Sequence, residues 1–515
     1  MTTADSARLF DGGGLSAVEL AARLGLESSG PDLVHRSWYD TFDRRLWTRG
    51  LTLEAQRPAK GTSPWTVTLR DRTAQTPHWV SAVPTVPARA DDLPEGPWRR
   101  SLGKVIGIRA LVPVTSSRVL TARLPVTDAD GKVVAEVFWE QLASDRGAAP
   151  TVRLVALRGY DGEARDAATR LVRELRLAPL ATHPLELAAG PIVVPPAGLG
   201  VVLDPARPAV EAIRLLLRSL WDAMEVVEPW LAAPPDTEFL HDYRVALRRS
   251  RSVLKLARHV MAPTALAEWR SRLRDLQRRT NLGRDLDVFL LEWPTYVAMI
   301  TDDVADDLKP LHVLLHLLRD EEQVQLVTYF SSADHQNVRE AYGTLLAGPL
   351  PSAHARLAGT PTADVAARRI RSAYRRVIQA GGVITPESPA TDLHELRILG
   401  KELRYALELF GSLLEPTALG ALVKELKQLQ DNLGEHQDSE VHAVELRSFA
   451  DRLGETGGHT GPTLMAVGLL IHAFSERQAA ARREFADRFA AFRGPGPRTQ
   501  VERLLAPLEK GRKTR

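Results

Sequence analysis

The chain of 515 residues contains no cysteine, so disulfide bonds, thiol nucleophiles and cysteine-bound zinc are excluded. Long apolar runs are absent as well. The late stretch from Leu464 to Phe474 is far shorter than the roughly 20 residues that a membrane helix needs. The opening residues, MTTADSARLF, lack the basic and apolar regions of a signal peptide. We therefore expect a cytoplasmic protein with no membrane partner.

Signals for a metal or a cofactor are equally scarce. Three glycines at 12–14 are not followed by the Gly-Lys-Ser/Thr of a phosphate loop. No His-x-x-x-His or glutamate-rich pair forms a convincing metal site. We therefore expect neither a metal site nor a cofactor, and the sequence does not indicate an oligomeric state.

Basic charge is concentrated on particular segments, although the formal net charge is only +3. Residues 238–260 contain six Lys or Arg and two acids, and residues 368–376 contain five arginines and no acid. Residues 302–322 are instead rich in acids. Such a concentration of cations is what an anion-binding surface requires.

Length and pattern predict more than one domain. Residues 1–190 mix strand and helix: the runs 65–69 and 133–139 are typical of strands, Asp128–Gly131 of a hairpin turn, and residues 17–24 and 163–177 of helices. Residues 191–206 are rich in Pro and Gly, which indicates a linker. From residue 207 the pattern is helical almost throughout. The fold class we expect is therefore multi-domain, α+β followed by all-α.

The helical part repeats itself. A shift of 153 residues aligns His241–Val288 with His394–Val441 without a gap, and 14 of these 48 positions are identical. We expect two packed helical bundles, repeat one at 207–358 and repeat two at 359–510, rather than a solenoid of short units.

Each repeat contains a helix with a basic face. In the first, a nearly straight stripe is formed by His241, Arg244, Arg248, Arg251, Lys255 and Arg258. The second begins in the same way with His394, Arg397, Lys401 and Arg404, but Glu408 follows. Arginine suits phosphate because its planar fork donates two hydrogen bonds. A single stripe of this kind is usually solvated or ion-paired, and the aspartates Asp285 and Asp438 have a structural use as caps or as partners for an arginine. The occurrence of this stripe in both repeats favours a role in anion binding.

The segments around His241, Arg284-Asp285, His394 and Leu429–Gly434 resemble the CHAD domain, the conserved histidine α-helical domain, over roughly residues 207–510. The resemblance implies two bundles related by pseudo-twofold symmetry, binding of inorganic polyphosphate, and association with polyphosphate granules. The polyphosphate-binding residues that we expect are His241, Arg244, Arg248, Arg249, Arg251, Lys255, Arg258, Arg371, Arg375, His394, Arg397, Lys401, Arg404 and Lys427. Glutamates at 402 and 408 depart from the first repeat and suggest a site weighted toward repeat one.

Residues 37–53 resemble the CYTH family of triphosphate tunnels, which implies an antiparallel barrel for residues 1–190. In that family, glutamates at the first and last strands bind Mg²⁺ or Mn²⁺. Here the opening Glu-x-Glu-x-Lys motif is absent, and the segment 152–158 carries no carboxylate. The sequence therefore favours a degenerate, non-catalytic barrel. Its candidate inward-facing cations are Arg70, Arg109, Arg118 and Arg123.

Three functions remain open at this point. The first is a polyphosphate-binding protein. The second is a metal-dependent triphosphatase or phosphotransferase acting through the N-terminal domain. The third is a nucleic-acid binder, which is disfavoured because few aromatic residues lie among the basic stripes.

Overall fold

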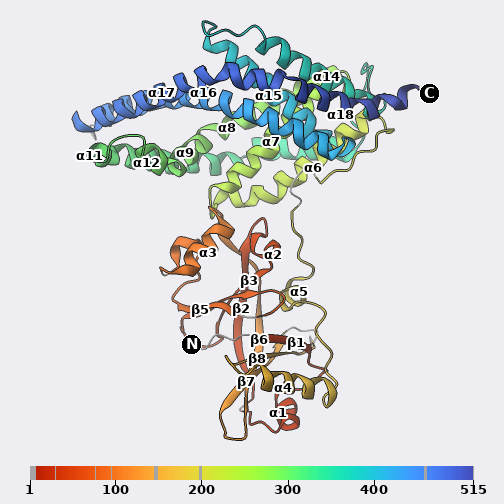
Figure 1. The fold of residues 1–515 in the computed structure, drawn as a ribbon, viewed down its shortest axis with the longest axis vertical. Helices are drawn as coiled ribbons and strands as arrows, with labels where there is room; N and C mark the ends of the chain where they lie inside the picture. The colour runs from red at the N-terminus through yellow and green to blue at the C-terminus, as the bar shows by residue number, and fades with distance from the viewer. Residues whose placement is uncertain are drawn as a thin grey trace. The chain divides into compact units, whose positions relative to one another are not determined.

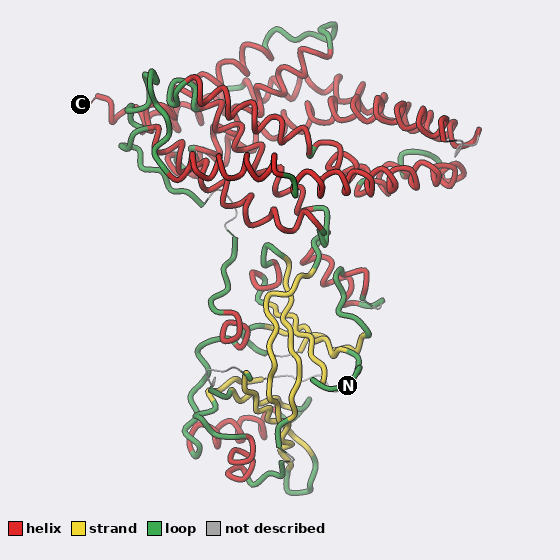
Figure 2. Tube along the Cα trace, turned by 180° about the vertical axis from the view of Figure 1, so that it is seen from behind, coloured by secondary structure: helices red, strands yellow, loops and turns green. Residues whose placement is uncertain are grey.

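The computed structural model describes residues 7–513 except positions 29, 76, 94, 144–148, 196–199 and 457–460. The chain divides into two compact units, Met1–Pro196 and Ala197–Arg515. The strands that the structure describes all lie in the first unit, and the second unit is helical (Figures 1 and 2). Of the expected linker 191–206, residues 196–199 lie outside the described residues. No described helix is long and apolar enough to cross a membrane.

The first unit contains one eight-stranded antiparallel sheet in the order β1-β8-β7-β6-β2-β3-β4-β5. Its strands are β1 (Ala7–Asp11), β2 (Asp32–Thr41), β3 (Leu51–Pro58), β4 (Trp65–Asp71), β5 (Pro77–Val83), β6 (Leu111–Thr127), β7 (Val133–Leu142) and β8 (Thr151–Ala156). The expected hairpin turn at Asp128–Gly131 joins β6 to β7, and Gly131 has a φ of 79°. The α+β antiparallel fold is thus confirmed. Among the described strands, β1 and β5 form the edges, so the sheet is a curled half-barrel rather than a closed ring.

Helices cover the outer face of this sheet. They are α1 (Ala17–Leu24), α2 (Arg45–Thr48), α3 (Pro97–Ile106) and α4 (Asp161–Arg173), whereas α5 (Pro184–Ala189) lines a hollow on the other face together with Arg36 and Glu140. Apolar residues of α1 and α4 pack with β7 and β8, and apolar residues of α2 and α3 pack with β3 and β4. Because side chains alternate along a strand, the residues between these apolar positions lie on the opposite, inner face. There the sequence places charged residues.

The second unit consists of thirteen helices among its described residues. They are α6 (Ala209–Val227), α7 (Glu238–Leu256), α8 (Pro263–Arg279), α9 (Asn281–Leu291), α10 (Trp293–Val297), α11 (Asp302–Ala305), α12 (Lys309–Phe330), α13 (Ala333–Ala347), α14 (Thr362–Gly381), α15 (Ala390–Leu409), α16 (Pro416–Thr456), α17 (Gly461–Arg493) and α18 (Pro495–Lys513). The long helices α16 and α17 run side by side (Figure 1). The all-α class expected for this part is confirmed.

The 153-residue offset also relates helices in the structure. The starts of α6, α7 and α8 correspond to those of α14, α15 and α16 within one residue. A backbone bridge joins Pro208 to Pro361, and these two positions are equivalent under the same offset. A contact between equivalent positions is what a pseudo-twofold axis produces. The repeats differ at residue 280, where α8 ends and α9 begins, whereas α16 continues unbroken through the equivalent Leu433. The repeat limits at 207–358 and 359–510 stay predictions.

Candidate anion-binding site

The helix α7 has a buried apolar face and a basic face. Its buried residues recur at helical spacing and include Phe239, Tyr243 and Leu247. The expected basic stripe lies on the remaining surface, where none of its members is fully buried. Burial of the apolar face therefore fixes the rotation of α7 about its own axis. That rotation decides which cations face the neighbouring helices.

The middle of this stripe lines a cavity of about 360 Å³. The cavity lies among α7, α8, α14 and α15, which supply side chains from both repeats. Six cations line it: Arg248, Arg251, Lys255, Arg369, Arg376 and Lys401. Leu256, Ile398 and Tyr405 add apolar surface. Cations from separate helices thus converge on one hollow, which no single stripe could produce.

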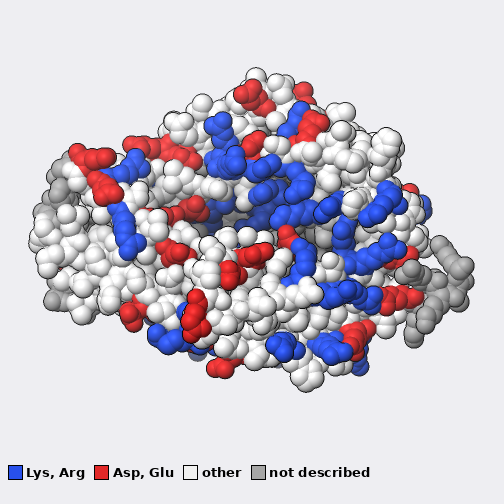
Figure 3. All heavy atoms as spheres, turned by 90° about the horizontal axis from the view of Figure 1, so that it is seen from above, with Lys and Arg blue, Asp and Glu red and all other residues white. Residues whose placement is uncertain are grey.

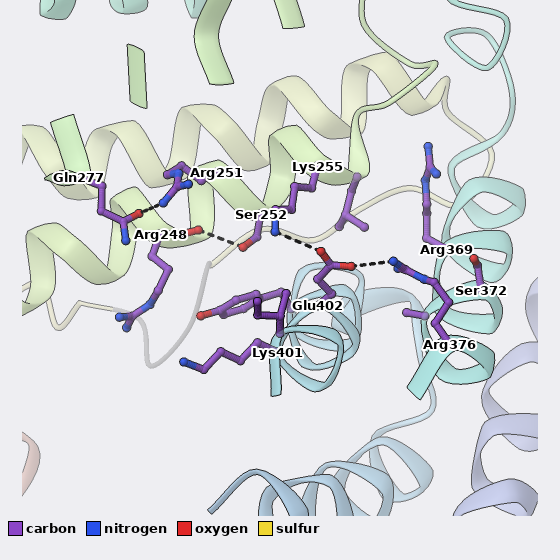
Figure 4. Close-up of a pocket in the computed structure, with 14 residues that line it drawn as sticks. Arg248, Arg251, Ser252, Lys255, Gln277, Arg369, Ser372, Arg376, Lys401 and Glu402 are labelled. Atoms are coloured by element: carbon purple, nitrogen blue, oxygen red, sulfur yellow. Dashed lines mark hydrogen bonds and ion pairs between the residues drawn. The ribbon is translucent and has the colours of Figure 1, made fainter. Parts of the chain in front are cut away.

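Figure 4 shows how these side chains are arranged. Glu402 lies between Lys255 and Arg376 and is joined to both by dashed lines. Its Oε1 is 3.1 Å from Lys255 Nζ, and its Oε2 is 3.0 Å from Arg376 Nη1. Arg251 donates a hydrogen bond to the side chain of Gln277. Glu402 is the only acidic residue among the cavity's described lining residues.

The cations of the cavity affect one another's proton affinity. Burial, together with the charges of Arg397 and Arg248, lowers the pKa of Lys401 to about 8. Burial and the arginines of α8 lower the pKa of Arg251. Burial likewise lowers the pKa of Arg369, with a contribution from neighbouring arginines. Unpaired positive charge therefore accumulates here at a cost to the folded protein, and a bound anion would remove that cost.

A broad basic surface surrounds the cavity. Figure 3 shows Lys and Arg side chains gathered around a hollow on one face of the helical unit. Three arginines on α8 recur every four residues, Arg270, Arg274 and Arg278, and all three are exposed. Their charges act on Arg251, so they lie within electrostatic reach of the cavity. A long anion could therefore extend from the cavity over α8.

The residues at the N-terminal end of each stripe make structural contacts and do not line the cavity. Arg244 donates hydrogen bonds to Thr280 Oγ1 at 2.8 Å and to Asn281 Oδ1 at 2.9 Å, where α8 meets α9. Burial is also the main cause that lowers the pKa of Arg244 to about 10. Burial and the charge of Arg284 lower the pKa of His241, so this ring is neutral at neutral pH. It can still donate one hydrogen bond.

The N-terminal end of the second stripe, which contains His394 and Arg397, makes similar structural contacts. Arg397 pairs with Asp438 at 2.7 Å, and the aspartate expected to hold an arginine does so here. The ring of His394 contacts Gln437, with Nδ1 2.6 Å from Oε1. Because these side chains already have partners, their part in binding an anion stays a prediction.

Other expected binding residues lie outside the cavity. Arg371 pairs with Glu509 of α18, and Arg404 pairs with Glu408 within α15. Arg258, Arg375 and Lys427 are exposed, and none of the three lines the cavity. Conversely, Arg369 and Arg376 line it but were not among the expected residues. They belong to the arginine-rich run 368–376, so their charge was visible in the sequence although their orientation was not.

The glutamates at 402 and 408 have a role that the sequence did not show. Glu408 lies 3.6 Å from Arg249 of α7, while Glu402 pairs with Lys255. In the sequence, Glu408 only marked the point where the second basic stripe is interrupted. It is instead a partner of α7, so repeat one supplies the cations and repeat two the acids at this helix contact.

The inner face of the first unit carries a separate charged cluster. Glu140 accepts from Arg36 at 2.7 Å and from Arg153 at 3.1 Å, and all three side chains are nearly inaccessible to solvent. Arg70 lies 3.7 Å from Glu54. Burial alone would raise the pKa of Glu140, but the charges of Arg36 and Arg153 outweigh it and hold the pKa far below its usual range. The inward carboxylates are therefore ionised and already neutralised by arginines.

Of the four cations expected inside the sheet, Arg70 alone belongs to this cluster. Arg109 is buried but lies beside Asp43, at 3.8 Å. Arg118 and Arg123 are both exposed but lie on opposite faces of β6: Arg118 pairs in register with His35 on the outer face, whereas Arg123 pairs with Phe138 on the inner face and contacts Glu136. The expectation was wrong for Arg118, whereas Arg123 does lie on the inner face. Within the described residues, no group of three His, Asp or Glu could hold a metal ion.

Comparison with known proteins locates a family in the second unit. Residues 212–447 match the family model of the CHAD domain. The chain is similar to the crystal structure of the CHAD domain from the plant Ricinus communis, with 23% identity, a TM-score of 0.48, and coverage of 57% of this chain and 96% of that one. It is also similar to PptA from Streptomyces chartreusis, with 17% identity, a TM-score of 0.44, and coverage of 55% and 99%.

A further similarity covers 36% of this chain. A protein from Hippeastrum, described as an adenylyl cyclase with a dominant triphosphatase activity, is 12% identical, with a TM-score of 0.29 and 96% of its own chain covered. No curated protein matches the chain. The helical unit of this protein therefore contains a CHAD domain, which the sequence matches over residues 212–447.

Proposed function

We propose that the helical unit binds inorganic polyphosphate, and that the cavity among α7, α8, α14 and α15 is the centre of its binding site. The observation that carries this proposal is the convergence of six cations from both repeats on a cavity with a single acidic residue. Polyphosphate is the polyanion that resemblance to the CHAD domain implies. Association with polyphosphate granules would follow from binding of this kind.

The chemistry of the cavity fits phosphate better than isolated carboxylates. Four of the six cations are arginines, which donate two hydrogen bonds in a fixed plane and match phosphate oxygens. Within the described part of the chain, Arg248 and Lys401 have no ion pair, so a ligand could contact them without breaking one. These two positions are equivalent in the repeats. A phosphate chain crossing the pseudo-twofold axis would therefore meet the same kind of contact on either side.

Binding of labelled long-chain polyphosphate to the full chain would test this proposal. We expect saturable binding without added metal. The dissociation constant for polyphosphate should be lower than that for DNA or RNA of similar charge at the same salt concentration. A nucleic acid that displaces polyphosphate at equal charge concentration would instead favour the nucleic-acid alternative. Absence of polyphosphate binding at low salt would refute the proposal.

A triphosphatase in the first unit is the second candidate. Its inner face contains Arg36, Arg70 and Arg153, which could contact a triphosphate. However, the buried carboxylates of Glu54 and Glu140 on this face are engaged by these arginines, and we propose that this unit is not catalytic. Measurement of phosphate release, described below, distinguishes the two.

A further inference from the structure

Glu402 is the one acid in a cavity of cations, and its carboxylate uses both oxygens. One oxygen contacts Lys255 of α7 and the other contacts Arg376 of α14 (Figure 4). About three quarters of the Glu402 side chain is shielded from solvent, with 24% exposed. Two of the six cations around the cavity are therefore already compensated by the protein itself.

The arrangement of this carboxylate resembles that of a bound phosphoryl group. Two oxygens on one centre, each accepting from a cation on a different helix, is how a phosphate would also be held. A phosphate that used Lys255 and Arg376 would have to displace Glu402 and leave its carboxylate without a partner. Because an unpaired, partly buried charge is costly, that displacement opposes binding.

The cost of displacing Glu402 affects the binding of short anions more than that of long ones. A short anion such as tripolyphosphate is confined to the cavity, so it must either displace Glu402 or make do with the four other cations. A long chain continues over the exposed arginines of α8, of which Arg274 and Arg270 act most strongly on Arg251. It can therefore collect enough contacts while the pairs of Glu402 stay intact.

We infer that Glu402 is a specificity-determining residue, an internal competing anion that keeps short phosphates out of the cavity while long polyphosphate chains bind. This inference rests on the proposed function. It assigns a purpose to a residue that would otherwise only weaken the site. The position equivalent to Glu402 in the first repeat is Arg249, so only one of the two repeats carries the competing anion here.

The chain provides a matched control. Glu408 also lies on α15 and also pairs with two cations, Arg249 and Arg404, but it does not line the cavity. The variants Glu402→Gln and Glu408→Gln change the net charge equally. Any difference between them in phosphate binding reports the local competition and not the overall charge.

Affinity for tripolyphosphate and for long-chain polyphosphate would be measured by calorimetry on the full chain and on both variants. Glu402→Gln is expected to bind tripolyphosphate about tenfold more tightly than the unaltered chain, about what one released charge-assisted contact contributes after screening. Glu408→Gln should change that affinity by less than about twofold, because its charge lies outside the cavity. Long-chain affinity should rise less than tripolyphosphate affinity in Glu402→Gln.

A second measurement excludes a purely structural role. Lys255→Ala should scarcely change tripolyphosphate affinity in the unaltered chain, where Glu402 occupies this lysine. In the Glu402→Gln background, Lys255→Ala should weaken tripolyphosphate binding several-fold, because the lysine then contacts the ligand. Thermal unfolding of each variant, measured alongside, shows whether the fold is retained.

The outcomes separate the two proposals. If long-chain polyphosphate fails to bind the unaltered chain, the proposed function falls and this inference falls with it. If long chains bind but Glu402→Gln and Glu408→Gln have equal affinities for tripolyphosphate, the inference alone is wrong. If Glu402→Gln unfolds, Glu402→Asp, which keeps the charge but shortens the side chain that contacts Lys255 and Arg376, is expected to tighten tripolyphosphate binding by a smaller factor. No tightening in a folded Glu402→Asp variant would overturn the inference.

Discussion

Lys255 and Glu402 pair across α7 and α15, and Arg249 and Glu408 pair across the same two helices with equivalent positions exchanged. Positions 249 and 402 correspond in the two repeats, as do positions 255 and 408. In a symmetric interface, residue i contacts j′ and residue j contacts i′. The same geometry is retained here, but cations occupy one repeat and acids the other. The duplication has therefore diverged into two complementary halves.

This complementarity predicts a charge-swap effect on stability. Arg249→Glu would place two acids side by side, and the free energy of unfolding should fall by about 1 kcal/mol, since the pair is partly exposed. Combining it with Glu408→Arg should recover most of the loss. Chemical denaturation of the single and double variants measures the coupling, and additive effects would contradict a direct pair.

A second prediction concerns the cavity. Replacing Arg248 and Lys401 together by Glu should weaken polyphosphate binding by more than about a hundredfold, because charge-assisted contacts contribute about 1.5–3 kcal/mol each before screening. The matched control replaces Arg375 and Lys427 by Glu, with the same charge change outside the cavity. Equal losses in both double variants would show that overall charge, and not the cavity, determines affinity. Arg244 is a poor target because its hydrogen bonds at the junction of α8 and α9 support the fold.

Binding should also depend on pH. The pKa of Lys401 is lowered to about 8, so this lysine is mostly protonated at pH 7 and loses its charge as the pH rises through 8. Affinity for polyphosphate is therefore expected to fall between about pH 7 and pH 9, where an ordinary lysine would still be charged. Lys401→Arg should flatten the profile. Stability should change in the opposite direction: the unfolded chain binds this proton more tightly, so the contribution of Lys401 to the free energy of unfolding increases as the pH rises above about 8.

A fourth prediction is a strong dependence on salt without a need for metal. Each phosphate neutralised by Lys or Arg releases counterions, so affinity should fall steeply as salt rises from about 50 to about 500 mM. Titrations with a chelator present would provide the comparison. Binding that requires Mg²⁺, or that ignores salt, would contradict direct contact between cations and phosphate.

The last prediction concerns the first unit. Because Glu54 and Glu140 are paired with Arg70, Arg36 and Arg153, they are poor metal ligands, and the full chain should not release phosphate from tripolyphosphate or nucleoside triphosphates at an appreciable rate. Phosphate release is measured with Mg²⁺ and with Mn²⁺. Metal-dependent turnover that Arg70→Ala abolishes would establish the enzyme alternative instead.

Several features could be predicted from local pattern. Helix Ala17–Leu24 was predicted at its observed bounds, and the strand at 65–69 lies inside β4, because capping residues and alternation act over a few neighbours. Predictions were less accurate for the face of a strand on which a side chain lies, because that face depends on contacts with residues distant in the sequence. Arg118 lies on the outer face of β6, opposite to the face that we expected, and nothing in its immediate neighbours signals this.

By itself, the sequence determined that the chain has a helical, duplicated second part with basic stripes at equivalent positions, because periodicity and the 153-residue offset are properties of the chain alone. Only the tertiary structure decided which cations meet. Arg248, Lys401 and Arg376 lie on three helices, and their convergence depends on how each helix is rotated and packed. It also decided that Glu402 pairs inside the cavity. Its contact with Lys255 joins residues 147 positions apart, and packing of the apolar faces, rather than charge, brings the two helices together.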